Sequence, residues 1–175
     1  RARATVVATG SIEQPSVFRN NDLPGVMFAS AAQRLVRLYA VKPGSRAVVL
    51  AANDDGYGAA LEMLDAGLAI AAMVDLRAEV PATELVQAVR RAGVEVLAGH
   101  AIKEAIAGPG KTRITGAIAA PVVGEGKLGE GGRTFDCDLI LMAVGYSPAA
   151  HLLHHAGTKF AYDANSHMYR PDLLP

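Results

Sequence analysis

Two hydrophobic runs without polar alternation stand out in the first half of the chain. Two segments are apolar at every position: residues 47–52, with the sequence AVVLAA, and residues 69–74, which Asp75 follows directly. Strands that are covered on both faces show such uninterrupted runs, whereas strands with one exposed face alternate. We therefore predict two buried strands of a parallel sheet.

Helical periodicity follows each of these runs. Residues 57–66 and 82–92 have apolar positions at helical spacing, each segment ends at a glycine, and residues 94–97 form a third apolar run. An amphipathic segment over residues 29–41 predicts a further helix. The order strand, helix, strand, helix, strand with short connections is that of a mononucleotide-binding half of a doubly wound sheet.

The pattern becomes antiparallel beyond residue 99. Residues 101–107, 112–123 and 133–135 are predicted strands of a β-meander, separated by glycine-containing turns. Residues 138–143, DLILMA, form another buried run. The predicted fold class is α/β: a Rossmann-like, three-layer βαβαβ domain with an antiparallel β-meander.

The two ends of the chain differ from this ordered centre. Residues 5–9 are predicted to form a short buried strand that Gly10 closes, and residues 11–25 a long polar surface connection. Residues 158–175 show no clear period, which predicts a loop or tail. The chain starts with Arg1 instead of Met, so we expect an internal fragment of a longer protein.

These patterns divide the chain into three segments, which are residues 1–28, residues 29–148 with the Rossmann-like pattern, and residues 149–175.

Charge and cysteine content narrow the class of protein. Seventeen basic and 17 acidic residues are scattered along the chain and cancel, so we expect no nucleic-acid partner. The longest apolar stretch, residues 66–74, is too short to cross a bilayer, so we expect no membrane partner either. The single Cys137 rules out an internal disulfide and favours a reducing, cytoplasmic location.

No catalytic or metal-binding residues are predicted. His151, His154 and His155 lie three and four positions apart on a predicted helix, but no carboxylate or cysteine is arranged with them, and a solvated helix face explains them. Cys137 lies between Asp136 and Asp138, whose charges should raise its pKa and make it a poor nucleophile.

The turn after the first central strand resembles a degraded dinucleotide-binding motif. The three glycine positions of G-x-G-x-x-G are occupied by Ala51, Asn53 and Gly56, so only the glycine for close helix-to-strand packing is present. Asp54 and Asp55 would repel a pyrophosphate, but at a helix N-terminus each stabilises by a few tenths to about 1 kcal/mol. Two interpretations of this turn are therefore possible: it binds a nucleotide, or it only caps the helix and binds no ligand.

Asp75 follows the turn by about the 20 residues that the motif requires. A carboxylate there suits the ribose hydroxyls of NAD, whereas Arg77 argues for the phosphate of NADP. The alternative is a solvated acid at the end of a strand. Ala51, Asn53, Gly56 and Asp75 are the candidate cofactor-binding residues of this segment.

Three flanking motifs carry a family resemblance. TVVATG at residues 5–10, NNDLPGV at 20–26 and DCDLILMAVGYSP at 136–148, in this order around the βαβ unit, resemble the two-dinucleotide-domain flavoproteins of the pyridine nucleotide-disulfide oxidoreductase type. The resemblance implies that the chain crosses between a flavin-binding domain and an inserted NAD(P)H-binding domain at the first and last motifs. The Rossmann-like NAD(P)-binding domain would then be flanked by pieces of a neighbouring FAD/NAD-binding domain. We expect the edge of this neighbouring dinucleotide-binding domain and a linker over residues 1–28, the NAD(P)-binding-like domain over residues 29–148, and a return segment toward the neighbouring domain over residues 149–175. No C-x-x-C pair is present, so disulfide-reductase chemistry is excluded.

The resemblance also implies cofactor contacts outside the βαβ unit. Thr9 and Gly10 match the A-T-G strand that lies beside a dinucleotide in the family, and Gly145 and Tyr146 match the A-x-G turn that approaches the nicotinamide.

Within this family, the N-D-D-G-Y turn and residues 8–44 are most similar to the alpha subunits of heterotetrameric sarcosine oxidases. Hydrogen cyanide synthase and opine oxidase subunits are the nearest alternatives. The resemblance implies an NAD-binding module, FAD or FMN in the parent complex, other subunits of a hetero-oligomeric oxidase as partners, and no catalysis by the chain alone. A stand-alone NAD(H) module that feeds a flavin and a purely structural Rossmann domain remain as alternatives.

Overall fold

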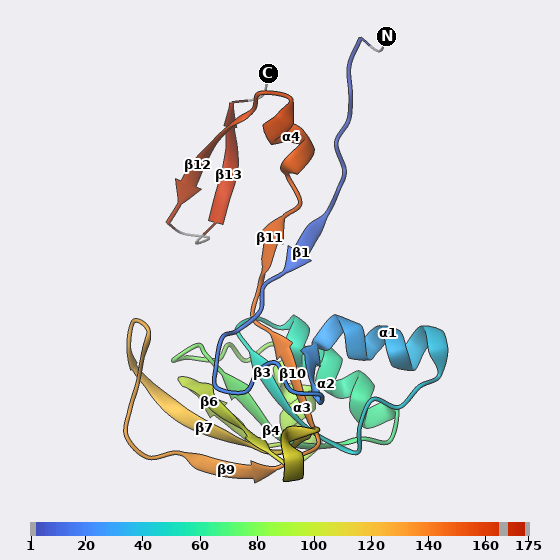
Figure 1. The fold of residues 1–175 in the computed structure, drawn as a ribbon, viewed down its shortest axis with the longest axis vertical. Coiled ribbons are helices and arrows are strands. Elements are labelled where there is room, and N and C mark those ends of the chain that lie inside the picture. Colours follow the sequence, from blue (N-terminus) through green and yellow to red (C-terminus); the bar gives the residue numbers. More distant parts are fainter. Residues whose placement is uncertain (1–2, 165–167, 174–175) are drawn as a thin grey trace. The chain divides into compact units, whose positions relative to one another are not determined.

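The computed structural model describes residues 3–164 and 168–173 and divides the chain into two compact units (Figure 1). The Rossmann unit comprises Pro15–Val144. The hairpin unit comprises Arg1–Gln14 and Gly145–Pro175. The chain therefore passes from one unit to the other twice, and each unit is described by itself.

A five-stranded parallel sheet forms the centre of the Rossmann unit. Its strands follow the order β2 (Val26–Phe28), β10 (Leu139–Ala143), β3 (Arg46–Ala51), β4 (Ala69–Asp75) and β5 (Val96–Ala98). The helices are α1 (Ala29–Tyr39), α2 (Asp55–Asp65) and α3 (Glu84–Arg91). The predicted α/β class with a mostly parallel central sheet is thereby confirmed.

The second sheet is antiparallel, as the meander prediction required. It contains β6 (His100–Ala107), β7 (Ile114–Gly124), β8 (Lys127–Leu128) and β9 (Arg133–Asp136), with a short 3-10 turn, η1, at Pro109–Lys111. β7 pairs with each of the other three strands. The helices lie on one face of the parallel sheet and this antiparallel sheet lies on the other (Figure 1).

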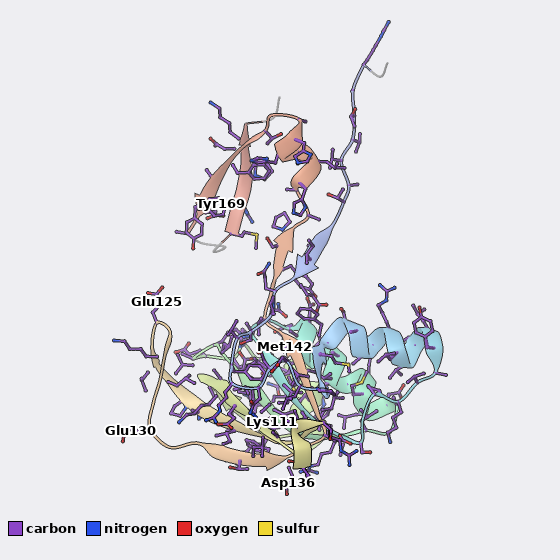
Figure 2. All side chains as sticks on the ribbon, in the orientation of Figure 1. Lys111, Glu125, Glu130, Asp136, Met142 and Tyr169 are labelled. Atoms are coloured by element: carbon purple, nitrogen blue, oxygen red, sulfur yellow. The ribbon has the colours of Figure 1, made fainter. Side chains whose placement is uncertain are left out.

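Alternate residues of β3 explain its uninterrupted apolar run. Val49 and Ala51 belong to the apolar cluster that includes the helices, whereas Val48 and Leu50 belong to the cluster that includes β6 and β7. All four are fully buried. The side chains of both layers fill the space on either side of the sheet (Figure 2), so neither face of the strand needs polar residues.

The hairpin unit corrects two predictions. Residues 5–9 form no strand; the first strand is β1 (Ser11–Glu13), which pairs with β11 (Tyr146–Pro148). β-forming residues are not sufficient for a strand without a partner, and β11 pairs with the three residues that follow Gly10 instead. After α4 (His151–His155), the expected tail contains an antiparallel pair, β12 (Lys159–Asp163) and β13 (Met168–Leu173).

Cross-strand side chains hold this pair together in place of a buried face. Tyr162 lies opposite Tyr169 with ring centroids 5.5 Å apart, and Arg170 pairs with Asp163 at 3.3 Å. Such pairs stabilise antiparallel ribbons without a regular apolar pattern. The remaining tail residues, 165–167 and 174–175, lie outside the described residues. Among the described helices, none is long and apolar enough to cross a membrane.

Candidate functional site: the carboxyl edge of the parallel sheet

The turn between β3 and α2 is closed by its own side chains. Asn53 Oδ1 accepts a hydrogen bond from the Asp55 backbone N–H at 3.0 Å, which is the local bond of an Asx turn. Asp54 occupies the N-cap position of α2, and its carboxylate is directed to Arg77. The turn therefore uses one of the first helix amides for internal bonding.

Gly56 allows α2 to pack directly on the sheet. A Cβ atom at this position would lie 2.8 Å from Ala51 Cβ and 3.3 Å from Ala143 Cβ. Both contacts are shorter than ordinary packing distances, and the nearer one belongs to a rigid strand residue. Ala51 and Gly56 thus meet at the helix-to-strand contact, where small residues set the distance between the two elements.

Asp75 is completely buried, which excludes the solvated strand-end acid considered above. Its Oδ1 accepts hydrogen bonds from the backbone N–H of Arg77 at 2.9 Å and from Arg77 Nε at 3.1 Å. Its Oδ2 accepts from Tyr57 Oη at 2.7 Å and from Arg77 Nη2 at 2.8 Å. A carboxylate offers about four lone-pair positions, so these four donors fill its capacity.

Arg77 joins the ends of two neighbouring strands. Besides its bonds to Asp75, its Nη1 donates to Asp54 Oδ1 at 3.1 Å, and its guanidinium carbon lies 5.8 Å from the centre of the Tyr57 ring. We call Asp54, Tyr57, Asp75 and Arg77 the Arg77 cluster. Parallel strands carry their carboxyl ends at one edge, which explains how residues from the β3–α2 turn and from the end of β4 meet.

The electrostatics of the cluster reinforce its hydrogen bonds. A hydrogen bond from Thr83 and the charge of Arg77 hold the pKa of Asp54 below its usual value. Burial and the hydrogen bond to Asp75 raise the pKa of Tyr57 well above its ordinary value, so its phenol stays protonated. The bond to Asp75 likewise raises the pKa of Arg77. A neutral phenol and a guanidinium therefore face two carboxylates.

The residues at this edge do not fit a dinucleotide. Ribose recognition needs a carboxylate with free acceptor positions, but those of Asp75 are filled by Tyr57 and Arg77. Pyrophosphate binding needs free amides and no negative charge at the helix start, but Asn53 engages an amide and Asp54 supplies a carboxylate.

The other four candidate residues lie in the hairpin unit. Thr9 Oγ1 donates to the Ala149 carbonyl at 2.5 Å, and the Ala149 N–H donates to the Gly10 carbonyl at 2.9 Å. Tyr146 is paired with Glu13 in the β1–β11 ladder, next to Gly145. The β1–β11 ladder therefore joins the two segments, but Thr9 and Gly10 bond to Ala149 whereas Tyr146 lies opposite Glu13, so the ladder does not place the A-T-G and A-x-G residues opposite one another. The hydroxyl of Thr9 is used within the chain.

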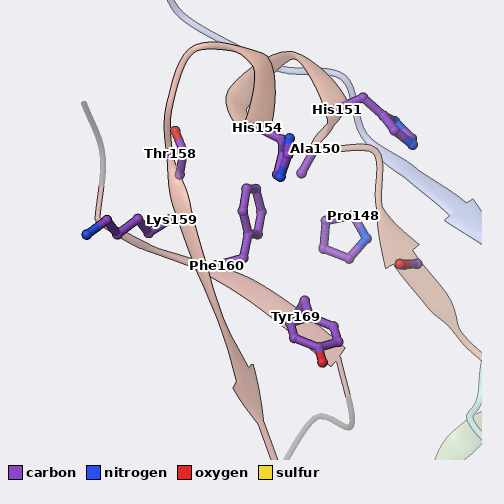
Figure 3. Close-up of a pocket in the computed structure, with 9 residues that line it drawn as sticks. Pro148, Ala150, His151, His154, Thr158, Lys159, Phe160 and Tyr169 are labelled. Carbon is purple, nitrogen blue, oxygen red and sulfur yellow. The ribbon is translucent and has the colours of Figure 1, made fainter.

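An open hollow in the hairpin unit was not predicted from the sequence. Pro148, His154, Phe160 and Tyr169 are among the residues that line it (Figure 3). The rings of His154 and Phe160 have centroids 6.0 Å apart. Thr158 also lines the hollow, and its buried hydroxyl has no hydrogen-bond partner among the described residues. Residues 158–175 have no clear hydrophobic period, so the sequence did not indicate this hollow.

The structure changes the explanation for Cys137. Burial is the main cause that raises its pKa to about 11, and the charge of Asp138 adds a smaller contribution. The charges next to Cys137 in the sequence therefore predicted the direction of its pKa shift correctly, but burial is the larger cause. Across residues 3–164 and 168–173, no group of three or more His, Cys, Asp or Glu side chains could hold a metal ion.

Sequence reasoning missed Tyr57 as a site residue. Its phenol is one of the four donors that satisfy the buried Asp75, and it follows the last glycine of the motif directly. An aromatic residue with a hydroxyl at the start of the helix, together with an acid at the end of the next strand, is the signal that could have indicated this pair.

Comparison with proteins of known sequence supports the resemblance. The sarcosine oxidase subunit alpha of Corynebacterium sp. (strain P-1) is 34% identical over 172 residues, and that of Corynebacterium sp. (strain U-96) is 31% identical over 171 residues. Each match covers 98% of this chain but only 17% of the relative, so the chain spans a small part of their length. No family model matches the chain.

Solved structures agree at the level of the fold. Thioredoxin reductase from T. acidophilum superposes with a TM-score of 0.67 at 14% identity, covering 92% of this chain and 54% of that one. A FAD-dependent pyridine nucleotide-disulphide oxidoreductase from Desulfovibrio vulgaris gives a TM-score of 0.62 at 20% identity, covering 93% and 43%. The chain thus has the fold of these FAD/NAD-binding oxidoreductases, and along nearly its whole length it is similar in sequence to a segment of sarcosine oxidase alpha subunits, as its motifs predict.

Proposed function

We propose that the chain is a nucleotide-binding-type domain of a flavin-dependent amine oxidoreductase of the sarcosine oxidase alpha-subunit type. The observation that carries the proposal is the 34% identity over 172 residues to a sarcosine oxidase subunit alpha. In this proposal the complete complex oxidatively demethylates sarcosine, and its FAD or FMN and its other subunits lie outside this chain.

The chain itself is catalytically silent in this proposal. Its single cysteine is buried and its thiol pKa is raised to about 11, so no reactive thiol supports redox chemistry. Between the two alternative roles of the domain, NAD(H) delivery and architecture, the Arg77 cluster favours architecture, because its residues already bind one another.

A segment exchange tests this assignment. The 172-residue region of the Corynebacterium alpha subunit that matches this chain is replaced by the chain, and the purified complex is assayed for subunit composition, bound flavin and sarcosine oxidation. We expect an assembled, flavin-containing complex that oxidises sarcosine. A control exchange with the corresponding segment of T. acidophilum thioredoxin reductase, which shares only the fold, should prevent assembly.

Two results would contradict the proposal. One is failure of the exchanged complex to assemble while the unmodified complex assembles under the same conditions. The other is sarcosine-dependent reduction of an artificial electron acceptor by the 175-residue chain alone, since that would place the catalytic site inside the chain.

A further inference from the structure

We propose that the Arg77 cluster is an intramolecular replacement for a nucleotide, so that the carboxyl edge of β3 and β4 binds neither NAD(H) nor NADP(H). The guanidinium of Arg77 occupies the role that ligand groups fill at this edge of a doubly wound sheet, where it bridges two strand ends. This inference concerns the chain's own ligand binding and does not rest on the proposed oxidase function.

Asp75 has no acceptor position left for a ribose hydroxyl. Its two oxygens receive four donors, one from Tyr57 and three from Arg77, and the side chain has no exposed surface. A ribose hydroxyl would have to displace one of these donors and leave it without a partner in a buried place. The loss of such a bond offsets the bond that the ribose would gain.

The start of α2 carries a negative charge. Asp54 places a carboxylate at the N-cap, where a phosphate would have to approach. Its lowered pKa, caused by the hydrogen bond from Thr83 and by Arg77, keeps it charged at neutral pH. A phosphate at the start of α2 would lie close to this carboxylate, and like charges repel one another, so Asp54 disfavours an anion at this position.

Arg77 is itself held by both carboxylates of the cluster. It reaches from the end of β4 to the turn after β3, across 23 residues of sequence, and its side chain is only 24% exposed. All three nitrogen atoms of its guanidinium group donate within the cluster. The charge that could have attracted the extra phosphate of NADP is therefore already neutralised by the two carboxylates.

Nucleotide binding is tested directly on the 175-residue chain. Backbone amide signals are followed by NMR while NADH, and separately NADPH, is added to millimolar concentration. We expect no saturable shift for residues 53–57 and 75–77. A saturable shift that maps to these residues would overturn the proposal, whatever the outcome of the segment exchange described above.

A double-mutant cycle tests whether the cluster acts as one unit. Asp54→Asn, Arg77→Gln and the double variant are compared by melting temperature. We expect the double variant to lose less than the sum of the single losses, by at least about 2 °C, because a shared interaction is removed only once. Glu84→Gln and Arg91→Gln provide the control, since that ion pair is largely exposed and should show no such coupling. Additive losses at Asp54 and Arg77 would overturn the proposal.

Discussion

The phenol oxygen of Tyr57 lies 2.7 Å from Oδ2 of Asp75, and neither side chain has any exposed surface. Water therefore cannot replace either partner when the other is removed. An unsatisfied buried group loses its full solvation, which makes this contact more sensitive to substitution than a similar contact at the surface.

Tyr57→Phe should destabilise the chain. The substitution keeps the ring but removes the donor to Asp75, and we expect the free energy of unfolding to fall by about 1–3 kcal/mol. Urea denaturation at neutral pH measures the loss. Tyr39→Phe is the matched control, because Tyr39 is 64% exposed and the same change there should stay within about 0.5 kcal/mol. Equal effects of the two substitutions would show that the buried bond contributes nothing.

Two glycines of α2 should respond in opposite directions to alanine. Gly56→Ala places a methyl group 2.8 Å from Ala51 Cβ, and we expect a loss of about 1–3 kcal/mol through overpacking. Gly58→Ala meets no atom within 4 Å and should gain up to about 1 kcal/mol from helix propensity. Thermal or urea unfolding of both variants measures the difference. A stabilising Gly56→Ala would mean that α2 does not pack this closely on β3.

Asp138 should contribute to stability only above acidic pH. Burial alone would raise its pKa, but hydrogen bonds from the backbone amides of Arg46 and Ser45 outweigh this and hold the pKa below the ordinary value of 3.8. Because the pKa is lower in the folded state, the contribution is fully present above about pH 4 and is lost as the pH falls through the folded-state value.

The variant Asp138→Asn tests this pH dependence. The difference in unfolding free energy between the original chain and the variant should be largest near neutral pH and should shrink as the pH is lowered below about 4. Urea denaturation across this range measures it. A difference that stays constant down to low pH would show that ionisation of Asp138 makes no contribution.

The Cys137 thiol should be unreactive in the folded chain. Its pKa of about 11, raised mainly by burial, leaves only about one thiolate in 1,000 molecules at pH 8. We expect a thiol reagent to modify Cys137 much more slowly in the native chain than in urea. Cys137→Ser gives the reagent baseline. Equal rates in the folded and unfolded states would contradict the burial of this side chain.

The elements that could be predicted are those whose burial leaves a pattern in the sequence. The runs at residues 47–52, 69–74 and 139–143 are apolar because layers cover both faces of β3, β4 and β10. β12 and β13 left no such pattern, because they are stabilised by cross-strand pairs and not by a buried face. The strand predicted over residues 5–9 from their β-propensity was wrong, because a strand also needs a pairing partner elsewhere in the chain.

The site was only partly predictable for a related reason. The spacing of Asp75 after the turn is a property of sequence, and so is its place at the carboxyl end of a strand. Whether that carboxylate is free depends on which donors reach it, and Tyr57 and Arg77 reach it only through the three-dimensional arrangement of α2 and β4. The degraded dinucleotide-binding motif therefore identified the correct edge of the sheet, but it could not indicate which donors occupy the acceptor positions of Asp75.

The position of β10 has a consequence for synthesis on the ribosome. β10 is the last strand of the parallel sheet along the chain, yet it lies between β2 and β3 and all five of its residues are buried. A nascent chain that ends before residue 139 has made four strands but lacks the one that joins β2 to the others. The sheet can close only after nearly all of the Rossmann unit has emerged, and until then the facing edges of β2 and β3 lack their partner, open to incorrect pairing or to a chaperone.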